Sequence, residues 1–421
     1  MIIRIGSLIE SLAETIDIVS SEVNNHHRRV ACISAYLGEA CGLPMNRFEN
    51  LILASALHDV GGLTTKDRLD LLSFDDSSGH HSEYGCMLLR AFKPFAHIAP
   101  IIRYHHTFWN QGQTRGTDGE EIPLESRIIF LADRVSVLIQ PDFSLSHVSG
   151  ICDRVKNYSG TMFMPQAVDA FLKVAKAESF WLDARDAYSQ RVFDNELSRN
   201  LHLNNEDLMS LGKLYSQIID FRSSFTSTHS SGVSAVAEAL AVHCGFSREE
   251  CLMMRLAGYL HDIGKLVVPE SILEKPAKLT TEEYDRMRCH TYYTNRLLIG
   301  VREFDTIRTW AAMHHERMDG SGYPFRIEGQ RIPLGARILA VADVFVAITE
   351  DRPYRKGMST EKALEIVTGM VKSGALDSRV VDVLMRFVGD IDCKRSTEQE
   401  HARREYGLFY EKMSTEAKKV G

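Results

Sequence analysis

The chain has 421 residues, of which 44% are hydrophobic and 25% charged, and a formal net charge of −7. This length suits two domains of roughly 200 residues each, and the acidic balance argues against DNA binding through a broad basic surface. No apolar run approaches the roughly 18 residues that a membrane span needs. The eight cysteines form no CxxC pair, so we expect free thiols in a reducing cytoplasm.

The predicted elements are helices along the whole chain. Residues 48–60 (FENLILASALHDV) and 251–264 (CLMMRLAGYLHDIG) carry apolar residues at three- and four-residue spacing, which predicts helices. Thr280 and Glu283 precede a further apolar-periodic segment in the pattern of a helix start. Gly and Pro make residues 319–324 (DGSGYP) a loop. Alternating β-branched runs are scarce, so we predict an all-α fold.

An internal repeat organises the chain. LHDVGGL at 57–63 and LHDIGKL at 260–266 differ at two of seven positions. IPLESRIIFLADRV at 122–135 likewise matches IPLGARILAVADVF at 332–345. The flanking polar residues pair at nearly constant offsets: His26 with His229, His58 with His261, Asp59 with Asp262, His81 with His290, His105 with His314, His106 with His315 and Asp133 with Asp343. We therefore predict two tandem helical-bundle domains, residues 1–200 and 201–421.

The second copy holds seven candidate metal ligands, namely His229, His261, Asp262, His290, His314, His315 and Asp343. Neighbouring ligands on a helix diverge by about 100°, so His261 and Asp262 could both grip an ion from the wall of a bundle. A carboxylate can bridge two ions while neutral imidazoles complete each shell. Five imidazoles and two carboxylates suffice for two transition-metal ions, and ions about 3.5–4 Å apart are the usual machinery of phosphodiester hydrolysis. The simpler explanation is a hydrogen-bonded polar core, but buried imidazoles and carboxylates are costly without partners.

Three motifs in the second copy carry a family resemblance. HDIGK (261–265), HHERMDGSGYP (314–324) and DVFVAITEDRPYR (343–355) resemble the HD-GYP domains, a branch of the HD phosphohydrolases, over most of residues 220–385. The resemblance implies all-α, HD-type helical bundles that hydrolyse a bacterial cyclic dinucleotide, cyclic di-GMP or 3′,3′-cyclic GMP-AMP. The implied products are linear dinucleotides or mononucleotides, and the implied cofactors are divalent iron or manganese ions.

The resemblance also implies a role for each matching residue. One ion would take His229, His261, Asp262 and Asp343, and the other would share Asp262 with His290, His314 and His315. Lys265 and Asp262 are the implied catalytic residues, with Lys265 facing the scissile phosphate. Arg352, Arg355 and Tyr323 are the implied substrate-binding residues, although the two arginines could equally be surface charges. The Gly322–Pro324 loop is also implied as a surface for a signalling protein partner.

One position departs from the family pattern. Family members with three metals carry a Glu four residues before the first His of the set. This chain has Phe225 at that position, and a phenylalanine cannot ligate a metal. We therefore predict two ions in the second copy.

The first copy keeps ligands and loses the residues that would touch a substrate. Its candidate metal ligands are Glu22, His26, His58, Asp59, His81, His105, His106 and Asp133. Gly62 stands where Lys265 stands, residues 110–115 (NQGQTR) replace DGSGYP, and no DRPYR follows Asp133. We predict a degenerate HD domain with a regulatory or structural role, which either binds metal or keeps these residues as a polar core. Hydrolysis of another nucleotide stays open.

Two functions from different classes fit these patterns. The first is a metal-dependent cyclic-dinucleotide phosphodiesterase. The alternative is a receptor that senses a cyclic dinucleotide, a metal or the redox state without hydrolysis and signals through a protein partner. An HD enzyme of ordinary nucleotides is disfavoured by the GYP and DRPYR motifs, and both a monomer and a homodimer are compatible with the sequence.

Overall fold

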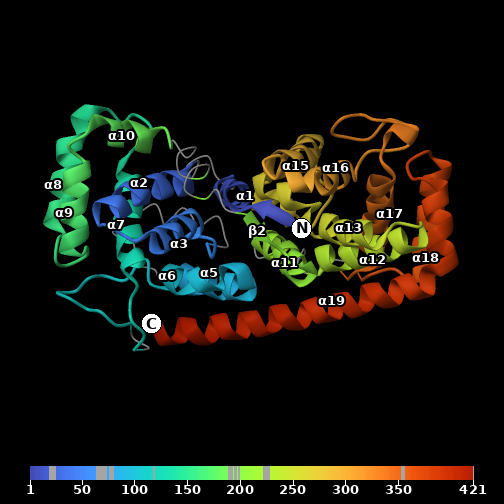
Figure 1. Ribbon diagram of the computed structural model, residues 1–421. Helices are drawn as coiled ribbons and strands as arrows, with labels where there is room; N and C mark the ends of the chain where they lie inside the picture. Colours follow the sequence, from blue (N-terminus) through green and yellow to red (C-terminus); the bar gives the residue numbers. More distant parts are fainter. Residues whose placement is uncertain are drawn as a thin grey trace. The chain divides into compact units, whose positions relative to one another are not determined.

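The computed structural model describes residues 1–18, 25–62, 74, 80–116, 119–187, 193, 197, 200–220, 228–351 and 356–420. The chain forms two compact units, whose main segments are Ile2–His202 and Leu203–Thr415. We call them the N-terminal unit and the C-terminal unit and describe each by itself (Figure 1).

The N-terminal unit is a bundle of helices with one small strand pair. Its elements are β1 (Ile2–Arg4), α1 (Ile5–Asp17), α2 (His26–Ala40), α3 (Met45–Leu57), α5 (His80–Ala91), η1 (Lys93–Ile98), α6 (Ala99–Arg103), α7 (Leu124–Leu138), η2 (Leu145–His147), α8 (Val148–Asn157), α9 (Pro165–Val174), α10 (Glu178–Arg185) and β2 (Asn200–His202). Strands β1 and β2 pair antiparallel with Ile2 opposite His202. The predicted all-α class is confirmed, and this two-stranded pair is the addition that the sequence did not indicate.

The C-terminal unit repeats the order of the helices that carry ligands. Its elements are α11 (Asn205–Asp220), α12 (His229–His243), α13 (Arg248–Leu260), η4 (Ile263–Val267), α14 (Glu270–Leu273), α15 (Thr281–Leu298), η5 (Arg302–Phe304), α16 (Asp305–Ala312), η6 (Gly329–Arg331), α17 (Leu334–Thr349), α18 (Thr360–Lys372) and α19 (Ser378–Val420). Helix α12 packs against α13 and α17, as α2 packs against α3 and α7. Helices α12, α13, α15, α16 and α17 therefore correspond to α2, α3, α5, α6 and α7.

Local sequence signals account for several helix boundaries. The Thr280 side chain accepts a hydrogen bond from the Glu283 backbone N–H, and the Glu283 side chain accepts from the Thr280 N–H, which confirms the predicted start of α15. Ser247 and Glu250 form the same reciprocal cap at α13. Each such cap contributes on the order of 1 kcal/mol. Residues 319–324 form no helix or strand, as predicted, and the charged tail is the continuation of the long helix α19.

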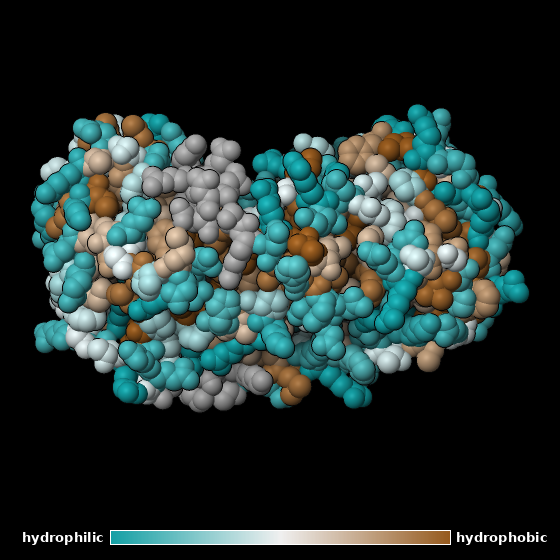
Figure 2. Space-filling model, viewed as in Figure 1, coloured by the Kyte–Doolittle hydropathy of each residue, from teal (hydrophilic) through white to brown (hydrophobic). Residues whose placement is uncertain are grey.

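Hydrophilic side chains cover most of the visible face of each unit, with apolar residues in small groups between them (Figure 2). Among the described helices, none combines the length and the apolar composition of a membrane span. All eight cysteines are free thiols, and three of them, Cys32, Cys86 and Cys251, are buried.

Candidate metal centres

Five elements of the C-terminal unit bring the seven predicted ligands together. The ligands are His229 at the first position of α12, His261 and Asp262 between α13 and η4, His290 in α15, His314 and His315 after α16, and Asp343 in α17. Their donor atoms form three groups, each within 4.8 Å: His229, His261 and Asp343; His261, Asp262 and His314; and His290, His314 and His315. The sequence placed His261 and Asp262 within a predicted helix, but α13 ends at Leu260: His261 is its C-cap, still with helical backbone angles, and Asp262 precedes η4.

The two oxygens of Asp262 face different imidazoles. Oδ2 lies 3.2 Å from His261 Nε2, whereas Oδ1 lies 3.5 Å from His290 Nε2. On the His261 side of Asp262, Oδ1 of Asp343 lies 3.2 Å from His229 Nε2. This is the arrangement in which one carboxylate can bridge two cations.

Three buried histidines present the same ring nitrogen to the centre. In each, Nδ1 donates to the carbonyl three residues earlier, at 2.8 Å from His261 to Gly258, 2.7 Å from His290 to Met287 and 2.6 Å from His314 to Ala311. These bonds fix the tautomer, so that Nε2 carries a lone pair. The three Nε2 atoms are buried and have no hydrogen-bond partner. A buried acceptor without a partner costs about 1–3 kcal/mol, and a pair of metal ions shared among these groups would satisfy all three.

The protonation states fit metal ligands. Burial lowers the pKa of His290 to about 3 and holds the pKa of His314 well below its usual range. Burial alone would raise the pKa of Asp262, but the neighbouring His261 and Lys265 hold it well below its usual range. The neutral imidazoles of His290 and His314 thus stand beside a charged carboxylate, a combination that divalent transition metals prefer. Burial would lower the pKa of His229, but the carboxylates of Glu350 and Asp343 raise it to about 10.

Two residues that the sequence reading missed orient His229. Its Nδ1 lies 3.0 Å from Oε1 of Glu350, and Oε2 of Glu350 accepts from Gln399 Nε2 at 3.4 Å. Both Glu350 and Gln399 are buried. Glu350 lies in the ITEDRPYR stretch, where an acidic residue at the end of an apolar helix was the available signal. A carboxylate on the far side of a ligating imidazole fixes the ring and raises its basicity.

Gly264 brings the HD turn against the helix that carries His290. A Cβ atom at position 264 would lie 1.9 Å from the His290 carbonyl oxygen and 2.6 Å from the Thr294 nitrogen. In the N-terminal unit, a Cβ at Gly61 would lie 2.1 Å from the His81 carbonyl oxygen. Only glycine permits this approach of two backbones, so the G of the HDxG string is a requirement of packing in both units.

The loop of residues 319–324 folds back beside the centre. Buried Glu316 accepts from the backbone N–H groups of Phe325 and Ile327, at 2.6 and 3.1 Å. The Tyr323 N–H donates to the His315 carbonyl, and the ring of Tyr323 lies 5.0 Å from the ring of His315. The Glu316 of the HHE motif therefore holds the loop, a role that the sequence reading did not assign.

A cavity of about 520 Å³ opens beside His314 and His315. Three arginines, Arg288, Arg317 and Arg326, and the ring of Tyr323 line it. The guanidinium of Arg288 stacks over Tyr323 at 4.9 Å. Sequence reasoning missed these arginines because no motif contains Arg288 or Arg326. Its own candidates Arg352 and Arg355, together with Phe225 and Glu22, lie outside the described residues.

Lys265 contacts the bridging carboxylate. Its Nζ donates to Asp262 Oδ2 at 2.6 Å, and its side chain is 21% exposed. Gly62 occupies the corresponding position in the N-terminal unit and offers no such group.

The N-terminal unit reproduces the cluster with its own seven side chains. Donor atoms of Asp59, His81, His105 and His106 lie within 4.8 Å of one another, and so do those of His26, His58 and Asp59. Asp133 in α7 faces His26, with Oδ1 3.3 Å from Nε2. His58 and His105 also donate from Nδ1 to the carbonyl three residues earlier, so the same tautomer faces this centre.

Comparison with protein families identifies both halves of the chain. Residues 213–380 and residues 23–138 each match the HD domain family. The chain is 33% identical over 394 residues, or 89% of its length and 90% of the relative's, to a protein of Vibrio cholerae called 3′3′-cGAMP-specific phosphodiesterase 1. It is 35% identical over 64% of its length, and 58% of the relative's, to the protein called 3′3′-cGAMP-specific phosphodiesterase 3 of the same organism.

Two further comparisons extend these matches. A protein of Pseudomonas aeruginosa called cyclic di-GMP phosphodiesterase PA4108 is 33% identical over 58% of this chain and 55% of its own. The crystal structure of a cyclic GMP-AMP phosphodiesterase of V. cholerae, V-cGAP3, superposes with a TM-score of 0.64 at 24% identity and covers 92% of this chain and 98% of its own. The superposition shows that the fold is shared along both units.

Proposed function

The chain belongs to the HD-GYP family of cyclic-dinucleotide phosphodiesterases, with two HD domains in tandem, and from that premise we propose that its C-terminal unit hydrolyses 3′,3′-cyclic GMP-AMP at the centre around Asp262. The observation that supports this proposal best is the division of the Asp262 oxygens between His261 and His290. A bridging carboxylate with imidazoles on both sides suits a pair of ions that acts on a phosphate ester.

We propose two divalent ions, iron or manganese, for this centre. The first would take His229, His261, Asp262 and Asp343, and the second Asp262, His290, His314 and His315. When bound, such ions activate water and neutralise charge on the phosphoryl oxygens. The unpaired Nε2 atoms of His261, His290 and His314 support this ligand set.

Lys265 and Asp262 are the proposed catalytic residues of the chain itself. The Lys265 ammonium group rests on Asp262 and is partly exposed, so it can turn toward a phosphate that enters the centre. There it would stabilise the negative charge that develops on the phosphoryl oxygens.

The substrate would enter the cavity beside His315. Arg288, Arg317 and Arg326 give its lining a positive charge, and guanidinium groups suit phosphate oxygens and the faces of bases. Tyr323 supplies an aromatic surface between the arginines and the centre. Arg352 and Arg355 remain proposed phosphate ligands on the family motif alone, and a partner surface on the Gly322–Pro324 loop remains a prediction.

The choice of 3′,3′-cyclic GMP-AMP over cyclic di-GMP rests on the extent of the matches. The relative that is named for this substrate is similar along both halves of the chain, whereas PA4108 is similar over 58% of the chain. We place the reaction in the cytoplasm, where eight free thiols persist in reduced form.

The test is a turnover assay of the full chain. The protein, loaded with Mn(II) or Fe(II), is incubated with each cyclic dinucleotide, and the products are separated by chromatography. We expect linear products, formed fastest from 3′,3′-cyclic GMP-AMP. Asp262→Ala should abolish turnover, whereas Asp382→Ala, at an exposed position of α19, should leave it unchanged.

Two results of this assay would decide against the proposal. A chain that holds two ions in its C-terminal unit, binds a cyclic dinucleotide tightly and releases no product would be a receptor. Turnover that survives Asp262→Ala would place the chemistry elsewhere.

A further inference from the structure

We propose that the N-terminal unit holds one divalent transition-metal ion in a centre that is closed to phosphate esters. This inference concerns a separate site and is independent of the reaction assigned to the C-terminal unit. It rests on ligand geometry, on buried polar atoms without partners and on two large side chains that fill the place of the substrate cavity.

The first set of ligands has the same geometry in both units. His26 Nε2 lies 3.3 Å from Asp133 Oδ1 and 3.9 Å from Asp59 Oδ2, and the matching distances around His229 are 3.2 and 3.9 Å. His58 Nε2 lies 3.2 Å from Asp59 Oδ2, as His261 does from Asp262.

Several polar atoms of the N-terminal centre are buried without a hydrogen-bond partner. They are His58 Nε2, Asp133 Oδ1 and both ring nitrogens of His106. A satisfied polar core would pair these atoms with each other or with the backbone. Donor atoms of His106, Asp59, His81 and His105 instead lie within 4.8 Å of one another, as do those of His58, His26 and Asp59, which is the condition of ligands that await a cation.

Two substitutions close the space that is open in the C-terminal unit. Ala340 and Val344 of α17 line the substrate cavity. The corresponding residues of α7 are Phe130 and Arg134, which are 1% and 0% exposed. The Phe130 ring packs at 5.4 Å from the His106 ring.

The ligand side chains of the N-terminal unit are also less exposed to solvent than their counterparts in the C-terminal unit. The Asp133 side chain is 1% exposed, against 13% for Asp343. His106 is buried, whereas the side chain of His315 is 30% exposed. Among the described residues, Phe130 and Arg134 therefore fill the place from which a phosphate ester can reach the edge of the C-terminal centre.

Arg134 also limits the number of ions. Its Nη2 donates to Asp133 Oδ2 at 2.6 Å, which leaves Oδ1 for a metal. With one divalent ion, the carboxylates of Asp59 and Asp133 and the Arg134 guanidinium give this buried site a net charge of one positive unit. Among the described residues of the centre, a second ion would raise the net charge to three, and such repulsion is large at low dielectric.

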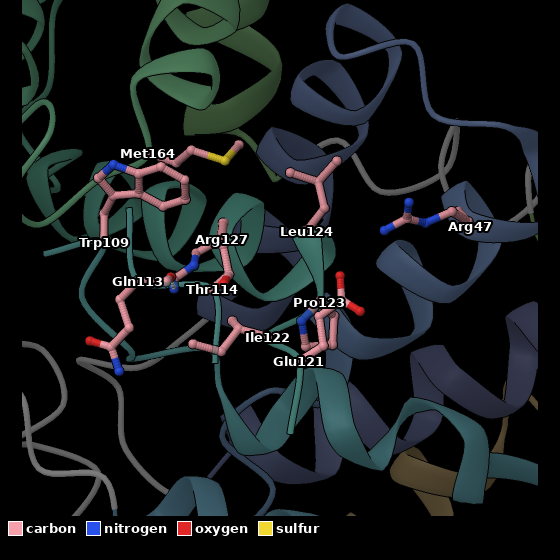
Figure 3. A pocket seen from close by; sticks show the side chains of 10 residues that line it. All are labelled: Arg47, Trp109, Gln113, Thr114, Glu121, Ile122, Pro123, Leu124, Arg127 and Met164. Atoms are coloured by element: carbon pink, nitrogen blue, oxygen red, sulfur yellow. Dashed lines mark hydrogen bonds between the residues drawn. The ribbon is translucent and has the colours of Figure 1, made fainter. Parts of the chain in front are cut away.

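The N-terminal unit also has a cavity of about 420 Å³, whose lining side chains are drawn in Figure 3. Trp109, Gln113 and Arg127 line it together with residues of the 121–124 segment. None of its lining residues belongs to the seven-residue cluster. The opening of this cavity is therefore lined by other residues than the N-terminal ligands.

The experiment uses the full chain with the C-terminal centre removed by the pair His261→Ala and Asp262→Ala. The protein is loaded with Co(II), freed of excess ion and analysed for cobalt per chain, and its visible absorption is recorded with and without inorganic phosphate. We expect one cobalt per chain and a spectrum that phosphate does not change. No retained cobalt, two retained ions or a spectrum that phosphate shifts would overturn the proposal.

The closing side chains are tested in the same background. Phe130→Ala with Arg134→Val copies the residues of the C-terminal unit, and we expect cobalt to remain bound and phosphate now to shift its spectrum. Phe171→Ala, at a buried position whose ring packs on Phe180 and Trp181, is the matched control and should leave the spectrum insensitive. A cobalt-loaded double variant that stays insensitive to phosphate would contradict closure by these residues. If the double variant does not fold, the cobalt count and the phosphate test of its parent still decide the proposal.

Discussion

The Nζ atom of Lys265 lies 2.6 Å from Oδ2 of Asp262, the carboxylate that stands between the two groups of imidazoles. An ammonium group in this position neutralises a buried carboxylate while no phosphate is present. In the proposed reaction, the same group would face the negative charge of a substrate once Asp262 ligates metal. The relationship gives a physical reason for the lysine that distinguishes the HDIGK string from its HDVGG counterpart.

Lys265→Ala should lower kcat by about 10²–10³-fold, the usual effect of removing one group that stabilises developing charge. Metal content should not fall, because the lysine competes with cations for Asp262. Steady-state kinetics and elemental analysis measure the two effects. Lys275→Ala is the matched control, since Lys275 pairs with Glu283 outside the centre. A variant that loses its metal together with its activity would show that Lys265 supports the fold of the site.

Glu350→Gln should weaken metal binding by the C-terminal centre about 10–100-fold, because the carboxylate no longer orients His229 or raises its basicity. The measurement is competition with a chelator of known affinity. Glu398→Gln provides the control, since Glu398 contacts Arg255 and Tyr259 instead of a ligand. Unchanged affinity would mean that the 3.0 Å contact between Glu350 and His229 serves packing only.

Acid should destabilise the C-terminal unit in part through Asp377. Burial would raise the pKa of this carboxyl, but the guanidinium of Arg337 and the Arg379 N–H hold it below its usual value of 3.8. A depressed pKa contributes stability that is complete above pH 3.8 and is lost as the pH falls below it. Urea unfolding between pH 5 and pH 2.5 should therefore show a smaller loss for Asp377→Asn than for the parent chain. An Asp382→Asn variant should follow the parent, because that position is exposed.

Gly264→Ala should destabilise the C-terminal unit by several kcal/mol, since the added Cβ would meet the His290 carbonyl oxygen and the backbone must shift. Thermal or urea unfolding measures the change. Gly389→Ala in α19 is the control, because nothing lies within 4 Å of its added Cβ and alanine is the better helix former by about 1 kcal/mol. Equal stability of the two variants would contradict the close packing of the HD turn against α15.

Much of this molecule follows from its sequence. Residue periodicity predicted the helices, and the Thr280 cap predicted the start of α15. The paired offsets of His and Asp pointed to the two clusters that the structure brings together. These properties are local or repeated, so a linear pattern carries them. The roles of Glu22, Phe225, Arg352 and Arg355 stay predictions.

Tertiary structure decided the rest. Glu350 stands 121 positions from His229, and no spacing rule indicates that their side chains meet. The sequence shows Phe130 and Arg134 only as members of a helix, and the fold places them beside His106 and Asp133 of the N-terminal cluster. Sequence by itself determined which potential metal-ligand atoms the protein contains, because ligand chemistry is a property of residue type. Only the fold decided which of them are open to a substrate, because access depends on what distant side chains fill.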